Sequence, residues 1–202
     1  MRIITTVLVQ IIAALFPSRL KAWLFSRLLG WEIGARTRIG LSLFLRCERV
    51  TIGAGCYIGH FNTFRRLKRL DIGETTQILN FNDFMAGHEA HWPASLSIGN
   101  HAQVTSHHFF DCSGGIQIGH DSLVGGRSAQ LWTHFYHAGK VRLRSLVIGN
   151  RCYVCARATL VYCHLPDDCV VAAGAVVTGD FTGAGPGLLL AGNPASIIKR
   201  KR

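Results

Sequence analysis

The chain has 202 residues, 49% of them hydrophobic, which excludes a generally disordered protein and is enough for one domain with a packed core. The formal net charge of +11 and the pI near 9.9 favour anionic partners such as phosphorylated cofactors, acidic glycans, nucleic acid or a lipid surface. Seven cysteines, an odd number without the dense framework of a small secreted domain, are typical of thiols in a reducing cytoplasm.

Residues 1–30 are predicted to form a separate helical segment. The apolar run "MRIITTVLVQIIAALFP" ends at Pro17 and is shorter than the ~20 residues needed to cross a bilayer. It also lacks an A-x-A-like cleavage site, which argues against a removable signal peptide. The next stretch, "PSRLKAWLFSRLLGW", mixes basic and apolar residues in an amphipathic manner. Two interpretations stay open, a helix packed on the end of the domain and an interfacial helix that contacts a membrane.

From about residue 33, an aliphatic residue returns every six positions, usually followed by glycine and, four positions on, by a small residue. The clearest copies begin at Ile52, Ile98, Ile118 and Ile148, and weaker ones at Ile33, Ile39, Ile72 and Ile78. A period of six fits neither a helix nor a long alternating strand. Each hexapeptide is therefore predicted to form one short strand and one corner, with the aliphatic side chain in the core and glycine at the corner. The small residues beside the core position are Ser122, Ser128, Cys152 and Ala158.

Three such sides would close a triangular coil of roughly 18 residues, and successive coils would stack at the ~4.8 Å spacing of neighbouring strands. The predicted fold is an all-β solenoid over residues 31–202. The repeat also accounts for "CYVC", because Cys152 falls in a small inward position and Cys155 in a position usually held by glycine. No second CxxC accompanies this pair, so we expect no metal there.

The repeat over residues 33 to 195 resembles that of the hexapeptide-repeat acyltransferases, whose fold is a left-handed parallel β-helix. The C-terminal stretches "LPDDCVVAAGAVVTGDF" and "LLLAGNPASIIKRKR" are similar to the closing coil, exit loop and tail of the galactoside, maltose and colanic-acid O-acetyltransferase branch. This resemblance implies transfer of an acetyl group from acetyl-CoA to a hydroxyl, by a homotrimer whose sites are shared between subunits.

In that branch, a histidine on the loop after two good hexapeptides is the general base. His134 in "QLWTHFYHAG" takes this place, and neutral imidazole is suited to removing a hydroxyl proton near pH 7. His134 comes one residue early, and Gln130 replaces the usual aliphatic residue, so His137 remains a second candidate base. The stretch "HFYHAGKVRLRS" interrupts the repeat, as a loop at the edge of a site would.

The other histidines have less specific surroundings. His101 and His120 are expected to be solvated, whereas His107 and His108, with Asp111, are candidates to support His134 across the stack. His88 and His91 lie in another interruption, "GHEAHWPAS". A zinc enzyme of the carbonic-anhydrase kind is the metal alternative, but its histidine spacing differs and it lacks the "AGNPA" tail.

The resemblance implies that acetyl-CoA lies along the β-helix wall. It places Ala156 and Ala173 beside the pantetheine arm and Thr178 and Lys199 near the nucleotide. Gly179 and Ser196 stand where the family often has basic residues, so "KRKR" at 199–202 is expected to supply charge for the phosphates.

The acceptor is predicted to be a sugar hydroxyl in surface polysaccharide or lipopolysaccharide synthesis. The apolar, basic N-terminus and the net charge favour a lipid-linked or anionic glycan at the inner, cytoplasmic face of a membrane. A small-molecule (xenobiotic or antibiotic) acetyltransferase and a non-catalytic scaffold are the alternatives. Nucleic-acid binding is disfavoured because no recognisable motif accompanies the charge.

Overall fold

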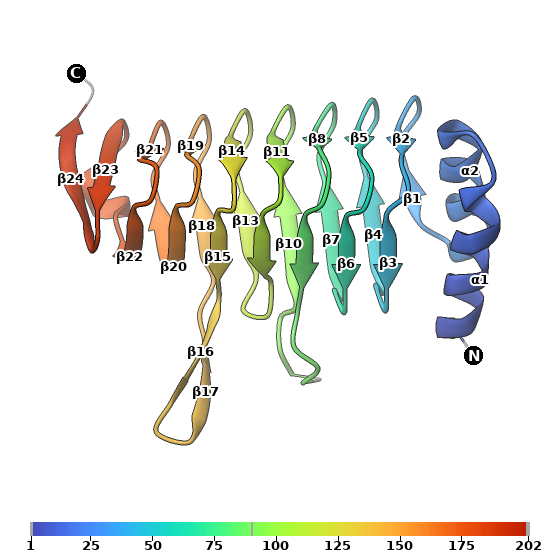
Figure 1. The fold of residues 1–202 in the computed structure, drawn as a ribbon, viewed down its shortest axis with the longest axis horizontal. Helices are drawn as coiled ribbons and strands as arrows, with labels where there is room; N and C mark the ends of the chain where they lie inside the picture. Colours follow the sequence, from blue (N-terminus) through green and yellow to red (C-terminus); the bar gives the residue numbers. More distant parts are fainter. Residues whose placement is uncertain (1, 90, 201–202) are drawn as a thin grey trace.

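The computed structural model describes residues 2–89 and 91–200 and shows a left-handed parallel β-helix with two helices at its N-terminal end (Figure 1). The predicted fold is thereby confirmed. Residues 201 and 202 of the basic tail lie outside the described residues.

The β-helix has three faces, each built from strands one coil apart. The first face contains β1 (Glu32–Ile33), β4 (Arg49–Ile52), β7 (Arg69–Ile72), β10 (Ser95–Ile98), β13 (Ile116–Ile118) and β18 (Leu146–Ile148). The second contains β2 (Arg38–Ile39), β5 (Tyr57–Ile58), β8 (Gln77–Ile78), β11 (Gln103–Ser106), β14 (Leu123–Arg127), β19 (Tyr153–Val154), β21 (Val170–Val171), β23 (Leu188–Gly192) and the antiparallel β24 (Ala195–Arg200). The third contains β3 (Leu43–Leu45), β6 (Thr63–Arg65), β9 (Asp83–Met85), β12 (Phe109–Asp111), β15 (Gln130–Trp132), β20 (Thr159–Leu165) and β22 (Val176–Asp180). The last residues of β20 turn onto the first face, where Leu165 pairs with Ile148.

The aliphatic repeat positions point inward and stack in columns. Ile52 pairs with Ile72, and Ile118 with Ile148, and all four side chains are almost completely buried. Along the third face, the core column is made of phenylalanine rings, with Phe64 between Phe44 and Phe84 at centroid distances of 4.6 Å. Each coil thus covers the apolar side chains of the one before it, which explains why the repeat is stable only as a stack.

The glycines after the aliphatic positions are needed because coils approach closely. Gly53 does not have a positive φ, but a Cβ atom there would lie 2.6 Å from the backbone nitrogen of Glu74 in the next coil. A Cβ on Gly149 would lie 2.7 Å from the nitrogen of Asp167. The left-handed corner conformation itself is adopted mostly by other residues, including Arg151 at φ 53°. Substitution of these glycines is thus blocked by the neighbouring backbone.

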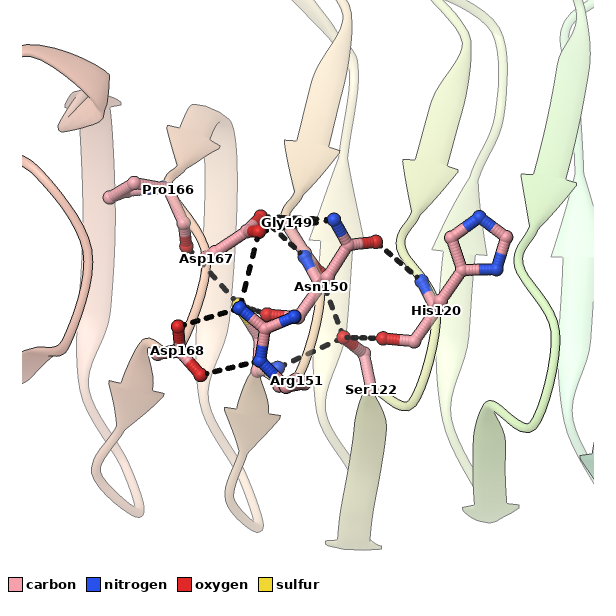
Figure 2. A network of polar contacts seen from close by, with 9 residues as sticks. His120, Ser122, Gly149, Asn150, Arg151, Pro166, Asp167 and Asp168 are labelled. Carbon is pink, nitrogen blue, oxygen red and sulfur yellow. Dashed lines mark hydrogen bonds and ion pairs between the residues drawn. The ribbon is translucent and has the colours of Figure 1, made fainter.

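Polar side chains connect the coils at the corner between the first and second faces (Figure 2). The His120 amide donates to Asn150 Oδ1, and the Asn150 amide donates to Asp167 Oδ1, both at 2.8 Å. Arg151 pairs with Asp168 at 2.8 Å in the same corner. Because the Asp167 carboxylate accepts a hydrogen bond from the Asn150 amide, the pKa of Asp167 is lowered and the carboxylate is held in its charged form. The His120 side chain is exposed as predicted, and its Nδ1 also accepts the Asn100 amide of the preceding coil at 2.9 Å.

One corner departs from the six-residue spacing. Leu131 is buried and pairs with Phe110, whereas Gln130 is exposed, because the corner after Val124 holds one residue more than its neighbours. Ser128 is consequently exposed, and Ala129 takes the inward position. The prediction for Ser128 was wrong by one residue, while Ser122, Cys152 and Ala158 are buried as expected.

The N-terminal segment forms α1 (Arg2–Ala14) and α2 (Ser18–Leu29), which cover the open end of the first coil. Phe25 and Trp31 pack edge-on against Phe44, so the helices and the coils share one core. The helical segment ends at Gly30, which has φ 68°. No helix in the described part of the chain is both long and apolar enough to span a membrane.

Candidate active site

Three insertions lie at the corner where the third face leads into the first face of the next coil. They are the loop 86–94, the turn 112–115 and a β-hairpin formed by β16 (His134–His137) and β17 (Lys140–Leu143). The loop and the hairpin project from the same edge of the rod (Figure 1). The interruption at 134–145 was predicted as a loop, but Ala138 and Gly139 both have positive φ, as a tight hairpin turn requires.

His134 forms a pair with the buried carboxylate of Asp111. His134 Nδ1 lies 2.6 Å from Asp111 Oδ2, where Asp111 is 1% and His134 36% exposed. Because an ionised carboxylate only accepts hydrogen bonds, Nδ1 carries the proton and Nε2 of the neutral ring is left as the acceptor. The geometry therefore prepares Nε2 to accept a proton.

Asp111 is itself held by a dense set of hydrogen bonds. The amides of Thr133 and His134 both donate to Oδ2 at 2.9 Å, and the Ser113 hydroxyl donates to Oδ1 at 2.6 Å. Ser113 Oγ in turn accepts from the amide of Gly87 at 2.9 Å. The loop, the turn and the hairpin base are thus joined through one carboxylate.

Aromatic rings surround His134. The Trp92 ring lies 6.1 Å from the imidazole centroid at an interplanar angle of 28°, and Trp132 lies 6.3 Å away on β15. Phe135 packs on Tyr162 of the next coil at 4.8 Å. The Tyr162 hydroxyl is buried without a hydrogen-bond partner among the described residues, and burial raises the pKa of Tyr162 to about 12. It is therefore a neutral donor next to the site.

His137 lies at the far end of the same hairpin. It pairs with Lys140 across the turn and is exposed, and two residues separate it from His134 at the hairpin base. Lys140, Arg142 and Arg144 make this hairpin basic, and all three are exposed.

His107 and His108 lie at the corner between the second and third faces, away from His134. His107 stacks on Phe81 at 4.9 Å, and His108 Nε2 lies 2.9 Å from Thr105 Oγ1. The expected support of His134 by this pair was wrong, because both histidines continue columns of corner residues from the preceding coils. Asp111, grouped with them in the prediction, is the residue that contacts His134.

Burial, and then the neighbouring His107, lower the pKa of His108 to about 4, below the ~6.5 of an unfolded histidine. The unfolded state therefore binds this proton more readily, so the contribution of neutral His108 to stability is complete above pH ~6.5 and is lost as the pH falls towards 4. We expect the free energy of unfolding to fall between pH 7 and pH 5, and to fall less in His108→Asn. Asparagine is the matched replacement because Asn82 occupies this position one coil earlier. Urea titrations of both proteins at both pH values measure the difference, and equal losses would contradict the assignment.

His164 lies at the same corner as His134, between the third and first faces, but its polar contacts are longer. His164 Nε2 lies 3.1 Å from Ser145 Oγ, and His164 Nδ1 lies 3.7 Å from Asp180. The Asp180 carboxylate is 61% exposed and accepts both the amide and the hydroxyl of Thr182, which lower its pKa. Of the two histidines, only His134 is held by a buried carboxylate.

The four candidate cofactor residues lie around the last coils. Ala156 and Ala173 are at the corner between the second and third faces of consecutive coils, where the Gly174 amide donates to the Ala156 carbonyl at 3.0 Å. Thr178 is exposed on β22, in register with Val161, which pairs with Trp132. Lys199 is exposed on β24, which packs against β22. Trp132, next to His134, and Thr178 therefore share one face.

Among residues 2–89 and 91–200, no group of three or more His, Cys, Asp or Glu side chains is arranged to hold a metal ion. His88 and His91 are exposed in the loop, and Cys152 and Cys155 are unpaired thiols. Burial raises the pKa of Cys155, which disfavours the thiolate that metal binding requires.

Solved structures share this fold. The N-acyltransferase AntD from Bacillus cereus, crystallised as a mutant with dTDP and coenzyme A, has a TM-score of 0.56 and 12% identity, with 88% of each chain covered. The polysialic acid O-acetyltransferase OatWY has a TM-score of 0.51 and 23% identity, with 84% of this chain and 87% of that chain covered. No family model and no curated protein matches the sequence.

Proposed function

From a left-handed β-helix in which a buried aspartate holds a half-exposed histidine at the base of a projecting hairpin, we propose an acetyl-CoA-dependent O-acetyltransferase that acts on a sugar hydroxyl. The observation that carries the proposal is the 2.6 Å contact between Asp111 and His134 Nδ1, which leaves Nε2 to act as the base. The homotrimer expected from the family resemblance is part of this proposal, and light scattering on the purified protein tests it.

The reaction is direct transfer. His134 Nε2 takes the proton of the acceptor hydroxyl as its oxygen attacks the thioester carbonyl carbon, and the negative charge of Asp111 stabilises the resulting imidazolium. The carbon–sulfur bond then breaks, and the proton passes from His134 to the thiolate of CoA. The ester and free CoA are the products, so no group remains on the enzyme.

The residues present fit a thin pantetheine arm along the wall. A Cβ atom on Gly126 would lie 2.5 Å from the Ala156 methyl group, so glycine is needed there for the two coils to pack closely. Nothing lies within 4 Å of the corresponding positions on Gly174 and Gly179, which keeps the surface there open. We propose that Ala156 and Ala173 flank the arm, and that Thr178 and Lys199 lie towards the nucleotide phosphates.

The surroundings of His134 support a sugar acceptor that is negatively charged. The half-exposed Trp132 offers a flat apolar face beside the base, whereas the buried Trp92 lies against the imidazole, and such rings combine apolar area with a polar edge. The exposed Lys140, Arg142 and Arg144 of the hairpin raise the local concentration of anionic substrates. OatWY is described as acting on polysialic acid, and AntD as an N-acyltransferase, so an amino sugar is the acceptor to test beside a hydroxyl.

Release of free thiol from acetyl-CoA tests the proposal. The acceptor panel holds neutral sugars, sialic-acid oligomers, lipid-linked glycans, an amino sugar and a small-molecule antibiotic. We expect turnover to be greatest with an anionic glycan hydroxyl. Turnover only with the amino sugar would reassign the enzyme as an N-acyltransferase, and no thiol release with any acceptor would reject acetyl transfer.

Gly87 is predicted to control the site through Trp92. A Cβ atom there would lie 1.8 Å from Trp92 Cζ3, so Gly87→Ala must displace the indole from beside His134. Small displacements at a reacting centre are costly, and we expect kcat/KM to fall by ~10- to 100-fold with little loss of thermal stability. Gly183→Ala is the matched control, because nothing lies within 4 Å of its added methyl group. Equal kcat/KM values for the two variants would show that Trp92 is not needed.

A further inference from the structure

The charge of the protein is concentrated at its helical end. Residues 1–70 contain 12 of the 22 lysines and arginines but only 2 of the 11 acidic residues, giving +10 of the net +11. Six arginines on α2 and the first two coils are exposed: Arg27, Arg36, Arg38, Arg46, Arg49 and Arg66. The rest of the chain is nearly neutral, so the positive charge is concentrated at the end that carries α1 and α2, whose place on the rod Figure 1 shows.

The same end exposes apolar side chains where a surface helix normally presents polar ones. On α1, Val9 and Ala13 are buried against the β-helix, yet Leu8, Ile11 and Ile12 are each more than half exposed. A helix that is apolar on all sides is typical of one buried in a second apolar phase. The exposed set continues through Leu15, Phe16, Leu20, Trp23 and Leu28.

The apolar surface is also hollowed. A cavity of about 290 Å³ lies between the helices and the first coil, lined by Val7, Ile11, Phe25, Leu41 and Leu43 among others. Leu41 and Leu43 are themselves 44% and 51% exposed. The apolar area therefore extends from the helices onto the coil, beyond what a single amphipathic helix offers.

We propose that this helical end docks on an anionic membrane surface. The exposed side chains of α1 and α2 insert at the boundary between headgroups and acyl chains, and the arginines of the first coils contact anionic headgroups. The net charge favours an anionic lipid surface as the partner and disfavours a second copy of the chain, because two ends that each carry +10 repel one another.

Co-sedimentation of the full-length protein with vesicles tests this proposal. The vesicles are phosphatidylcholine alone, or phosphatidylcholine with phosphatidylglycerol. We expect binding to the anionic vesicles, at least tenfold weaker binding to neutral ones, and weakening by salt. Co-sedimentation needs no acetyl-CoA, so a negative result would reject the membrane proposal and leave the proposed enzyme activity untouched.

The apolar variant is Leu15→Ser with Trp23→Ser, and the charge variant is Arg36→Gln with Arg38→Gln. Ile198→Ser, which removes a 61% exposed side chain at the opposite end, is the matched control. We expect both N-terminal variants, with unchanged melting temperatures, to bind anionic vesicles at least tenfold more weakly, and Ile198→Ser to bind as wild type does. The proposal is overturned if the wild-type protein stays in solution with anionic vesicles, or if Ile198→Ser loses as much binding as the N-terminal variants. It is also overturned if the apolar variant binds vesicles as wild type does and its only change is the dissociation of an oligomer.

Discussion

His134→Ala is expected to lower kcat of acetyl transfer by ~10²- to 10⁴-fold, the usual contribution of a general base. The KM for acetyl-CoA should change little, because the proposed cofactor residues lie elsewhere on the wall. His137→Ala is the matched control, since it removes a histidine from the exposed end of the same hairpin. Steady-state thiol release measures both variants.

Asp111→Asn separates the role of the pair from that of the imidazole alone. The amide nearly matches the carboxylate in shape but cannot accept hydrogen bonds at both positions, so it no longer selects the tautomer with a free Nε2. We expect a loss of kcat approaching that of His134→Ala, and a double variant no worse than the single ones. Loss of turnover in His137→Ala, with retention in His134→Ala, would assign the base to His137.

Phe64→Ala is expected to lower the free energy of unfolding by about 3–5 kcal/mol. Its ring is fully buried between Phe44 and Phe84, so truncation leaves a cavity that neighbouring coils cannot fill without breaking register. Such a loss is a large part of the 5–15 kcal/mol that stabilises a typical domain. Urea titration followed by circular dichroism measures it.

Phe61→Ala provides the comparison within the same coil. Phe61 is 57% exposed at the corner, where it stacks on Phe81 at 5.1 Å and lies 6.1 Å from the His60 ring, so its truncation opens no internal cavity. We expect it to cost less than about 1.5 kcal/mol, of the order of one aromatic pair. Similar losses in both variants would mean that the inward column does not dominate stability.

The repeat was readable from the sequence because its signal is local. An aliphatic residue every six positions specifies a short strand and a corner regardless of the other coils, and Ile52, Ile118 and Ile148 all occupy the core as predicted. The choice of His134 as leading candidate came from the same counting, together with the family resemblance. Both predictions depend on residues within one or two hexapeptides.

The error at Ser128 shows where counting fails. One additional residue in a single corner moved Ala129 and Leu131 into the core positions, and its local sign was Gln130 at the place where the repeat expects an aliphatic residue. Trp92 was overlooked for a related reason, since the length of an insertion does not say which of its residues folds back over the site. Its nearest signal was the glycine at 87, whose missing Cβ makes room for the indole.

The sequence by itself determined the solenoid and the helical end, because both rest on patterns along the chain, whereas the left-handed β-helix and the two histidines worth testing also needed the family resemblance. Only the tertiary structure decided that Asp111 contacts His134 and that His107 and His108 lie at another corner. Asp111 and His134 are 23 residues apart, and which residues meet across stacked coils depends on the lengths of all the corners and insertions between them. Coil lengths vary, since the coil from Ile118 to its partner Ile148 is longer than the coil from Ile148 to its partner Leu165. The contact between Asp111 and His134 therefore exists only once the coils have stacked.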